Sequence, residues 1–468
     1  MKKGGNAIDA AVAVQFALAV VYPQAGNIGG GGFLVYRDSL GAVAALDFRE
    51  KAPAASTETM YQDAEGTVIS EKAQMGHLAG GVPGSVDGMW QAHQKYGKLP
   101  WKDLVQPAID YATNGFRITK QEADNLIAEH NDFLKYSTSG SAFTQKKDWK
   151  VGNNLVQSEL AATLTRIRDL GRDGFYAGET AQYIVEEMQR GKAIMTLKDL
   201  QDYASVWRKP IEFDYKNYHL ISMPPPSSGG LLLQQMLTMV KPLPLASYGF
   251  HSSEAVHAMV EAERRAYADR AAHMGDPDFW NVPTIITDST YLNERMRSFD
   301  KDKATKSAEM GAGNIVESEQ TTHFSIIDPQ GNAVSVTTTL NDSYGSRMVV
   351  RGAGFIFNNE MDDFSAKPGV PNIYGLVGSE ANRIQPGKRM LSSMTPTIVL
   401  KDNKLHLVVG SPGGGTIPTS VYQVFLNVAE FGMALPEAVQ SKRFHHQYLP
   451  DTIVIEKAAL SPETVAKL

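Results

Sequence analysis

The spacing of hydrophobic residues predicts mainly helices from about residue 81 to residue 320. Apolar residues recur there about every 3.6 positions, which places them on one face of an α-helix. The clearest helical stretches are 85–96, 101–114, 158–171, 181–190 and 253–274. Three prolines at 224–226 and the pair Gly229–Gly230 interrupt this pattern before another helix.

The apolar run from residue 10 to residue 21 also predicts a helix. Because the run follows a basic start, it imitates a secretion signal, but Asp9 and Gln15 interrupt it and no small-residue cleavage site follows before Pro23. We therefore expect a helix buried in the core. A bilayer-spanning helix takes about 20 mostly apolar residues, and no stretch of the chain meets that requirement, so the sequence predicts no membrane span.

The period of the pattern changes from 3.6 to 2 shortly after residue 320. Residues 322–328 and 333–339 read as strands, and the turn sequence Pro-Gln-Gly-Asn separates them. This arrangement predicts a β-hairpin. Further strands are expected at 33–36, 395–400 and 405–409, and a further helix near 418–431.

Four consecutive glycines at 29–32 lead into one of these strands. A phosphate-binding loop opens a helix instead, and a Lys-Ser or Lys-Thr pair follows its glycines. Because both features are missing here, we expect the glycines to have a structural role.

The composition indicates a folded protein whose partners are small molecules. The chain has 468 residues, 43% of them hydrophobic and 21% charged, within the globular range. Its formal net charge is −6 and no stretch gathers five or six basic residues, so nucleic acid is not an expected partner. The chain has no cysteine, so its chemistry must use oxygen or nitrogen.

Thr321 stands where a polar segment meets the predicted hairpin. Residues 302–320 are rich in Lys, Ser, Glu, Gly and Asn, which is typical of an exposed connector. Threonine is common in strands, so position alone does not single out Thr321. The stretch from Thr321 to Asn341, TTHFSIIDPQGNAVSVTTTLN, however, closely resembles the start of the small subunit of γ-glutamyltransferases, which are N-terminal-nucleophile hydrolases.

Other motifs of that family occur in the expected order. They are GGNAIDAA at 4–11, LDFRE at 46–50, NNEMDDF at 358–364, LSSM at 391–394, SPGG at 411–414 and RFHHQ at 443–447. The resemblance implies an α/β fold, a four-layer αββα sandwich with two central, mostly antiparallel sheets between helical layers. It also implies a precursor that cuts itself between Gln320 and Thr321, giving a large-subunit segment (1–320) and a small-subunit segment (321–468) of one interwoven domain.

Self-cleavage would activate the nucleophile. A threonine hydroxyl is a weak nucleophile near neutral pH, but an α-amino group on the same residue, with a pKa of about 8, can accept its proton. That amine exists only after Thr321 has attacked the Gln320 carbonyl and the peptide bond has broken. By resemblance, Thr339 orients the nucleophile, and the backbone N–H groups of Gly413 and Gly414 stabilise the oxyanion.

A γ-glutamyl donor carries an α-carboxylate and an α-ammonium group at the end away from its reacting carbonyl. Arg49 suits the carboxylate because its planar guanidinium can bind both oxygens. The matching family positions are Ser392 and Ser393 for the carboxylate, and Asn341, Glu360 and Asp363 for the ammonium group. Many relatives carry glutamine at the position of Glu360, which leaves the preferred acceptor open.

The segment 368–379 resembles the loop that covers the site in lidded members of the family. Tyr374 occupies the position that shields the nucleophile from water. His445 and His446 lack the spacing of zinc ligands, so we expect a packed or hydrogen-bonded pair. Asp362 is expected to be structural. The sequence indicates no cofactor and no metal.

The resemblance implies a γ-glutamyltransferase and glutathione hydrolase, which passes the γ-glutamyl group of glutathione or a related compound to an amino acid, a dipeptide or water. Two alternatives stay open. One is a related acylase that acts on a cephalosporin or glutaryl side chain or on poly-γ-glutamate, although Arg49 and the two serines fit a free α-carboxylate. The other is an uncleaved chain with a binding role only, although Thr321 and Thr339 are intact.

Both ends depart from the family pattern. Relatives have an export signal and a further strand before the GGNAIDAA motif, and closing strands after the position of Leu468. Missing strands would leave sheet edges open and weaken the core. From the relatives, we expect a periplasmic or secreted location for the complete protein.

Overall fold

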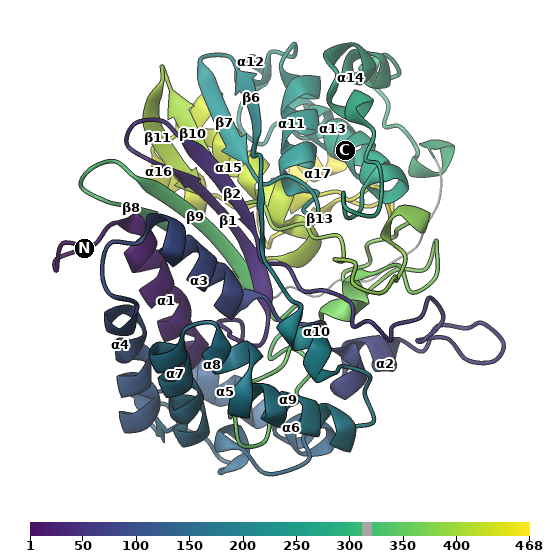
Figure 1. The fold of residues 1–468 in the computed structure, drawn as a ribbon. Helices are drawn as coiled ribbons and strands as arrows, with labels where there is room; N and C mark the ends of the chain where they lie inside the picture. The colour runs from purple at the N-terminus through teal and green to yellow at the C-terminus, as the bar shows by residue number, and fades with distance from the viewer. Residues whose placement is uncertain (311–320) are drawn as a thin grey trace.

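The computed structural model describes residues 1–310 and 321–468. Within these residues, two antiparallel sheets lie face to face, and helices cover the outer side of each (Figure 1). The order of layers is therefore helix, sheet, sheet, helix. This confirms the four-layer sandwich predicted from the sequence.

The first sheet has the strand order β5-β2-β1-β9-β8 in the described part of the chain. Its strands are β1 (Gly31–Arg37), β2 (Val43–Asp47), β5 (Val206–Arg208), β8 (Thr322–Ile327) and β9 (Ala333–Thr339). The predicted hairpin is thus confirmed as β8 and β9. Because β1 pairs with β9 from Gly31↔Thr339 to Arg37↔Ala333, the sheet joins residues from both sides of position 320.

The second sheet has the order β11-β10-β7-β6 and also crosses that position, since β10 pairs with β7. Its strands are β6 (Ile211–Tyr215), β7 (Tyr218–Ser222), β10 (Thr397–Lys401) and β11 (Lys404–Val409). Strands β5, β6 and β7 interrupt the region predicted as mainly helical. They are short, and distant partners stabilise them, so their own sequence gives a weak signal.

Helices of the first outer layer pack on β1, β2, β8 and β9. The layer contains α1 (Ala7–Val21), α3 (Ser85–Tyr96), α4 (Trp101–Asn114), α7 (Ser158–Leu170), α8 (Asp173–Tyr176) and α9 (Gly178–Arg190). At its border lie α2 (Ser70–Gln74), α5 (Lys120–Ala128), α6 (His130–Tyr136), α10 (Leu197–Gln201) and the short strand pair β3 (Phe116–Arg117) and β4 (Asn154–Leu155). The predicted buried helix is α1. It begins at a capping box, in which Asn6 and Asp9 each accept the other's backbone N–H.

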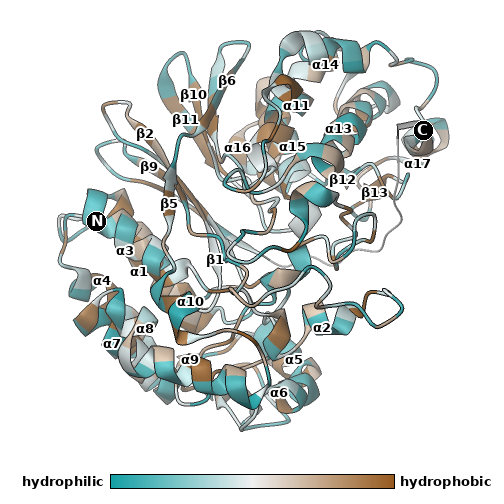
Figure 2. Cartoon of the chain, turned by 45° about the vertical axis from the view of Figure 1, so that its right-hand side comes forward, coloured by the Kyte–Doolittle hydropathy of each residue, from teal (hydrophilic) through white to brown (hydrophobic). Residues whose placement is uncertain are grey.

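The second outer layer covers the other sheet. It contains α11 (Gly229–Val240), α12 (Leu245–Tyr248), α13 (Ser253–His273), α14 (Ser289–Met296), α15 (Ile417–Ala429), α16 (Leu435–Gln440) and α17 (Pro462–Lys467), with the short pair β12 (Phe444–His445) and β13 (Val454–Ile455). Figure 2 shows hydrophilic and hydrophobic residues on the helices of both layers, as expected where one face meets a sheet and the other meets solvent. None of the helices in the described residues is long and apolar enough to span a membrane.

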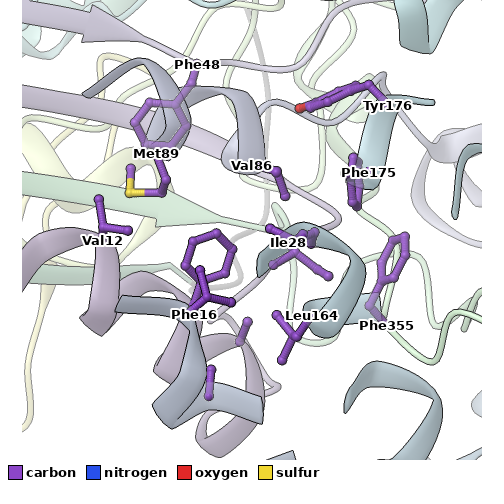
Figure 3. Packing of buried hydrophobic residues seen from close by; sticks show 14 of the residues in the cluster. Val12, Phe16, Ile28, Phe48, Val86, Met89, Leu164, Phe175, Tyr176 and Phe355 are labelled. Carbon is purple, nitrogen blue, oxygen red and sulfur yellow. The ribbon is translucent and has the colours of Figure 1, made fainter. Parts of the chain in front are cut away.

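Alternating side chains of β1 join two different cores. Leu34 and Tyr36 belong to the core under the first helical layer, where Val12 and Phe16 of α1 pack with Met89 of α3 (Figure 3). Phe33 and Val35 point to the opposite face and pack between the two sheets. This period of two explains why β1 is buried on both sides and why it can fix the sheets relative to each other.

The glycines at 29–32 serve close packing, as predicted. A Cβ on Gly30 would lie 2.1 Å from the Thr339 carbonyl oxygen, and a Cβ on Gly31 would lie 2.5 Å from Glu50 Oε2. Side chains at these positions would therefore push β1 away from β9 and from the segment after β2.

Candidate active site

The hairpin places Thr321 beside Thr339. Thr322 pairs with Thr338 across β8 and β9, so the residue before β8 lies next to the last residue of β9. Both threonines are buried and line one pocket. Gln320 and the predicted cleavage bond lie outside the described residues, whereas residues 302–304 of the predicted connector are exposed.

The turn after β9 brings Asn341 to the same pocket. Asn341 has a φ of 80°, a left-handed conformation that asparagine adopts more readily than most residues. Its backbone N–H donates to Thr339 Oγ1 at 2.9 Å, and its side-chain amide donates to the Asn359 carbonyl at 3.0 Å. The Thr339 hydroxyl is thereby held in a fixed direction.

Arg49, just after β2, is buried among three carboxyl groups. Its Nη1 lies 2.5 Å from Glu360 and 3.7 Å from Glu50, and its Nη2 pairs with Asp363. We call these four residues the Arg49 cluster. Burial by itself would lower the pKa of Arg49, but the carboxylates of Glu360, Asp363 and Glu50 raise it. The guanidinium therefore stays charged.

The three acids of the Arg49 cluster share one low-dielectric site. Burial raises the pKa of Glu50 to about 8, and it also raises the pKa values of Glu360 and Asp363, while Arg49 opposes the rise in each case. Neither carboxyl oxygen of Glu50 has a hydrogen-bond partner in the described residues. Glu50 therefore keeps its proton into the neutral range, and the ionisation of each acid in the cluster affects that of its neighbours.

Ser392 and Ser393 form another wall of the pocket. The backbone N–H of Ser392 donates to the Pro226 carbonyl at 2.9 Å, and its carbonyl accepts from the Ser228 N–H and hydroxyl, both at 2.8 Å. Ser393 Oγ accepts a hydrogen bond from Arg270 at 3.2 Å. The proline-rich break before α11 and the helix α13 thus hold the two serines in place.

Gly413 and Gly414 lie where a short 3₁₀ helix (Gly414–Thr416) leads into α15. Their φ values are 127° and 48°, which glycine adopts without strain. The first N–H groups of a helix have no partner within it and carry a partial positive charge. The amide groups of the glycine pair therefore lie at the positive end of a helix, and Gly414 lines the pocket.

The segment 368–379 contributes Tyr374 and Leu376 to the lining of the pocket. Asn372 Nδ2 donates to Asp363 at 2.9 Å, and the Ile373 N–H donates to Asp362 at 2.7 Å. The Tyr374 hydroxyl donates to the Asn341 carbonyl, and the Tyr374 carbonyl accepts from Gln447 at 3.2 Å. Asp362 is therefore a structural anchor of the segment, as expected, and Tyr374 is buried against Gly414.

The predicted site residues meet at this one pocket. It is lined by Arg49, Thr321, Thr339, Asn341, Asp363, Tyr374, Ser392, Ser393 and Gly414, with Leu376, Met394 and Ile417. Glu360 adjoins it through Arg49, and Gly413 adjoins it through Gly414. The free space is about 20 Å³, close to what one water molecule needs. A ligand of amino-acid size enters only when the Arg49 cluster or Tyr374 moves.

Sequence reasoning missed several residues around this pocket. Leu376, Met394 and Ile417 supply its apolar lining, and Glu50 completes the Arg49 cluster. Tyr267 and Arg270 of α13 contact residues at its wall or next to it: Tyr267 donates to the Gly415 carbonyl at 2.5 Å, and Arg270 donates to Ser393, which lines the pocket. Their spacing of three inside a predicted helix was the available signal, since polar residues on the buried side of a helix need distant partners.

His445 and His446 are both buried and hydrogen-bonded to neighbouring residues, in agreement with the packed or hydrogen-bonded pair predicted from the sequence. His445 bonds Thr419 at 2.8 Å and Gln447 at 2.9 Å, while His446 accepts from the Tyr448 N–H at 3.1 Å. Burial lowers the pKa of His445 to about 4 and that of His446 to about 3. Within the described residues, no group of three His, Asp or Glu side chains is arranged to hold a metal ion.

Known proteins resemble this chain along its whole length. The profile of the gamma-glutamyltranspeptidase family matches residues 1–468. The glutathione hydrolase proenzyme of Escherichia coli (strain K12) is 47% identical over 473 residues, which cover 100% of this chain and 81% of that relative. The glutathione hydrolase proenzyme of Pseudomonas sp. (strain A14) is 47% identical over 468 residues, which cover 99% of this chain and 81% of that relative.

Solved structures support the same relationship. The γ-glutamyltranspeptidase of Helicobacter pylori is 44% identical with a TM-score of 0.65, over 66% of this chain and 90% of that one. The cephalosporin acylase of Bacillus halodurans is 26% identical with a TM-score of 0.82, over 95% of this chain and 80% of that one. On the full-length family match and these identities, this chain belongs to the γ-glutamyltranspeptidase family.

Proposed function

We propose that this protein is a self-cleaving γ-glutamyltransferase and glutathione hydrolase with Thr321 as its nucleophile. The observation that carries the proposal is the joining of three features in one pocket: a threonine beside the connector, amide donors at a helix start, and a buried arginine among carboxylates. The relatives described above as glutathione hydrolase proenzymes support both the activity and the precursor.

In the first step the precursor breaks the bond before Thr321. The Thr321 hydroxyl adds to the Gln320 carbonyl, the acyl group moves from nitrogen to oxygen, and water hydrolyses the resulting ester. Thr321 then carries a free α-amino group, which can take the hydroxyl proton during later attack. Cleavage leaves residues 1–320 and 321–468 as large and small segments, which stay together because both sheets contain strands of each.

In the second step Thr321 takes up the γ-glutamyl group. Its oxygen attacks the γ-carbonyl of the donor, the carbonyl oxygen becomes negative, and the N–H groups of Gly413 and Gly414 stabilise that charge. The C–N bond of the donor then breaks, and the leaving amine takes the proton that the α-amino group held. Thr339, fixed by the Asn341 N–H, orients the Thr321 hydroxyl. Water or an amino acid or dipeptide amine finally attacks the ester.

A donor can enter by exchanging partners with the Arg49 cluster. Its α-carboxylate pairs with Arg49 and with the hydroxyls of Ser392 and Ser393, while its α-ammonium group pairs with Glu360, Asp363 and Asn341. Because each buried charge that loses a partner gains a new one, the exchange avoids the large penalty of an unpaired buried charge. Tyr374 closes over the site and limits the access of water.

Three anilides test this proposal: the γ-glutamyl donor and two analogues that each lack one of its two charged groups. They are γ-glutamyl, glutaryl (without the α-ammonium group) and 4-aminobutyryl (without the α-carboxylate) p-nitroanilide. We expect the cleaved protein to turn over the γ-glutamyl compound at least about 100-fold better than either analogue in kcat/KM, since each missing charge leaves a buried group unpaired. A preference for glutaryl anilide would support the rival acylase and contradict the proposal. A periplasmic or secreted location, expected from the resemblance, stays a prediction.

A further inference from the structure

Helix α13 carries a row of buried polar side chains next to residues that line or adjoin the pocket. Glu263, Tyr267 and Arg270 are spaced four and three residues apart, so they share one face of the helix, and they are 0%, 1% and 5% exposed. Glu263 accepts the His446 N–H at 2.9 Å, and Tyr267 donates to the Gly415 carbonyl at 2.5 Å. Arg270 bonds two serine hydroxyls. The three side chains thus contact residues 393, 415 and 446, all on the C-terminal side of position 320. Arg270 also contacts Ser228, in the turn before α11.

Arg270 differs from the other buried arginines of α13. Arg264 and Arg265 each form an ion pair with Glu261. Arg270 forms no ion pair with any residue in 1–310 or 321–468; its Nε donates to Ser228 Oγ at 3.0 Å and its Nη2 to Ser393 Oγ at 3.2 Å. A buried guanidinium without a carboxylate is costly, so its positive charge is available to an anion that binds nearby.

The contact with Arg270 restricts the direction of the Ser393 hydroxyl proton. A serine hydroxyl has one proton to donate and two lone pairs that accept. One lone pair of Ser393 Oγ is occupied by Arg270, and Ser393 lines the pocket. The Ser393 proton is therefore free to point into the pocket, toward an acceptor such as a carboxylate oxygen.

Arg270 also balances the charge of the pocket. Burial lowers the pKa of Arg270, Tyr267 and Asp363 oppose this, and Arg49 adds to it. Asp363 is thus influenced by two guanidinium groups: Arg49, which pairs with it, and Arg270. Loss of Arg270 removes one positive charge from the surroundings of Asp363, which makes the pocket less favourable for a further carboxylate.

We propose that Arg270 is a positioning residue for the α-carboxylate of the donor, acting through the Ser393 hydroxyl and through its own charge behind that hydroxyl. It touches neither the donor nor the reacting atoms. This inference rests on the proposed function, because it takes the donor to be a γ-glutamyl compound whose carboxylate meets Ser392 and Ser393.

The test compares Arg270→Met and Arg270→Lys with the wild type, on γ-glutamyl and 4-aminobutyryl p-nitroanilide. For Arg270→Met we expect KM for the γ-glutamyl compound to rise about tenfold or more, with kcat changed less than about threefold, because the Ser393 hydroxyl loses the contact that orients it toward the carboxylate and the positive charge behind it is lost. With the analogue that lacks the carboxylate, kcat/KM should change less than about threefold. Arg270→Lys keeps the charge but cannot bond both serine hydroxyls, so its KM for the γ-glutamyl compound should lie between those of the wild type and Arg270→Met.

Tyr267→Phe is the matched control. It disturbs the same row of α13 but removes the bond to Gly415, beside the glycine pair, so it should lower kcat for both anilides by a similar factor and leave their ratio unchanged. Should Arg270→Met yield no folded protein, Arg270→Lys decides alone. Equal losses on both anilides in the Arg270 variants, or no loss on either, would overturn the proposal.

Binding of L-glutamate separates this inference from the proposed function. L-Glutamate carries the same α-groups as the donor, and calorimetry measures its Kd without turnover. We expect Arg270→Met to weaken L-glutamate about tenfold or more and to leave 4-aminobutyrate unaffected. If the cleaved wild type turns over neither anilide but binds L-glutamate in this Arg270-dependent way, the proposed function fails and the positioning role stands. If L-glutamate binds equally to wild type and variant, the positioning role fails.

Discussion

Removing Arg49 should destabilise the ligand-free protein as well as abolish donor binding. Arg49 is 1% exposed, lies 2.5 Å from Glu360 and pairs with Asp363. In Arg49→Met, both carboxylates remain buried without their cation. Breaking a buried pair in this way costs about 3–5 kcal/mol of folding free energy. The variant is best made in a Thr321→Ala background, which we expect to remain a single chain.

The penalty should grow as the pH rises. Burial already raises the pKa values of Glu360 and Asp363, and Arg49 opposes that rise, so its loss raises them further. An acid whose pKa is raised in the folded state loses its contribution to stability as the pH rises through that pKa. At pH 5 the two acids can take up protons and remain neutral, so we expect a small penalty there and the full 3–5 kcal/mol near pH 8.

Urea unfolding followed by circular dichroism at pH 5 and pH 8 measures this effect. Arg297→Met is the control, since Arg297 is 78% exposed and pairs only with Glu294 on α14 in the described residues. The triple variant Arg49→Met/Glu360→Gln/Asp363→Asn should recover most of the lost stability, because the two carboxylates that paired most closely with Arg49 no longer carry a charge. The reasoning is refuted if Arg49→Met matches the control at both pH values, or if neutralising the acids restores nothing.

Three further predictions concern the same pocket. Gly414→Ala should lower kcat at least about 100-fold, since the new Cβ would lie 2.5 Å from the Tyr374 ring in a left-handed backbone position; steady-state turnover of γ-glutamyl anilide checks this. Tyr374→Ala should raise the share of hydrolysis over transfer to a dipeptide, measured from the free glutamate and transfer product formed. In the Thr321→Ala background, Glu50→Gln should become more stable relative to its parent from pH 5 to pH 8.5 in urea unfolding. In the parent, protonated Glu50 contributes to the free energy of unfolding. Because its pKa is about 8, this contribution is lost as the pH rises, and it amounts to about 1.4 kcal/mol per unit by which the pKa is raised.

The hairpin was predictable because its information is local. Alternating residues and a turn sequence define β8 and β9, and their register puts Thr321 beside Thr339. Similarly, the helical period alone identified α3 and α4 with the bounds that the structure has. Where an element depends on its own residues, the sequence pattern is enough.

The Arg49 cluster could not be derived from local pattern. Arg49 and Asp363 are 314 positions apart, and no periodicity relates them; the family resemblance brought them together in the prediction. Strands β5, β6 and β7 were missed for a related reason, since these short segments depend on distant strands for pairing. Long-range pairing is the part of this fold that a pattern of hydrophobic residues does not contain.

The polar row of α13 is the clearest residue-level omission. Charged residues inside a helix are usually solvated, so the spacing of Arg270 from Tyr267 was only a weak signal of burial. Its burial depends on Ser228 and on Ser393, which is 123 positions away. Only the assembled fold shows that this arginine faces the site.

The central claim is that Thr321 becomes the N-terminal nucleophile by self-cleavage. The most direct test is intact mass measurement with N-terminal sequencing of the purified protein after incubation at neutral pH, beside Thr321→Ala. We predict two pieces, one beginning at Thr321, for the wild type, slower but correct cleavage for Thr321→Ser, and one uncleaved 51.0 kDa chain for Thr321→Ala. An intact wild-type chain that turns over γ-glutamyl anilide, or a new terminus at another residue, would contradict it.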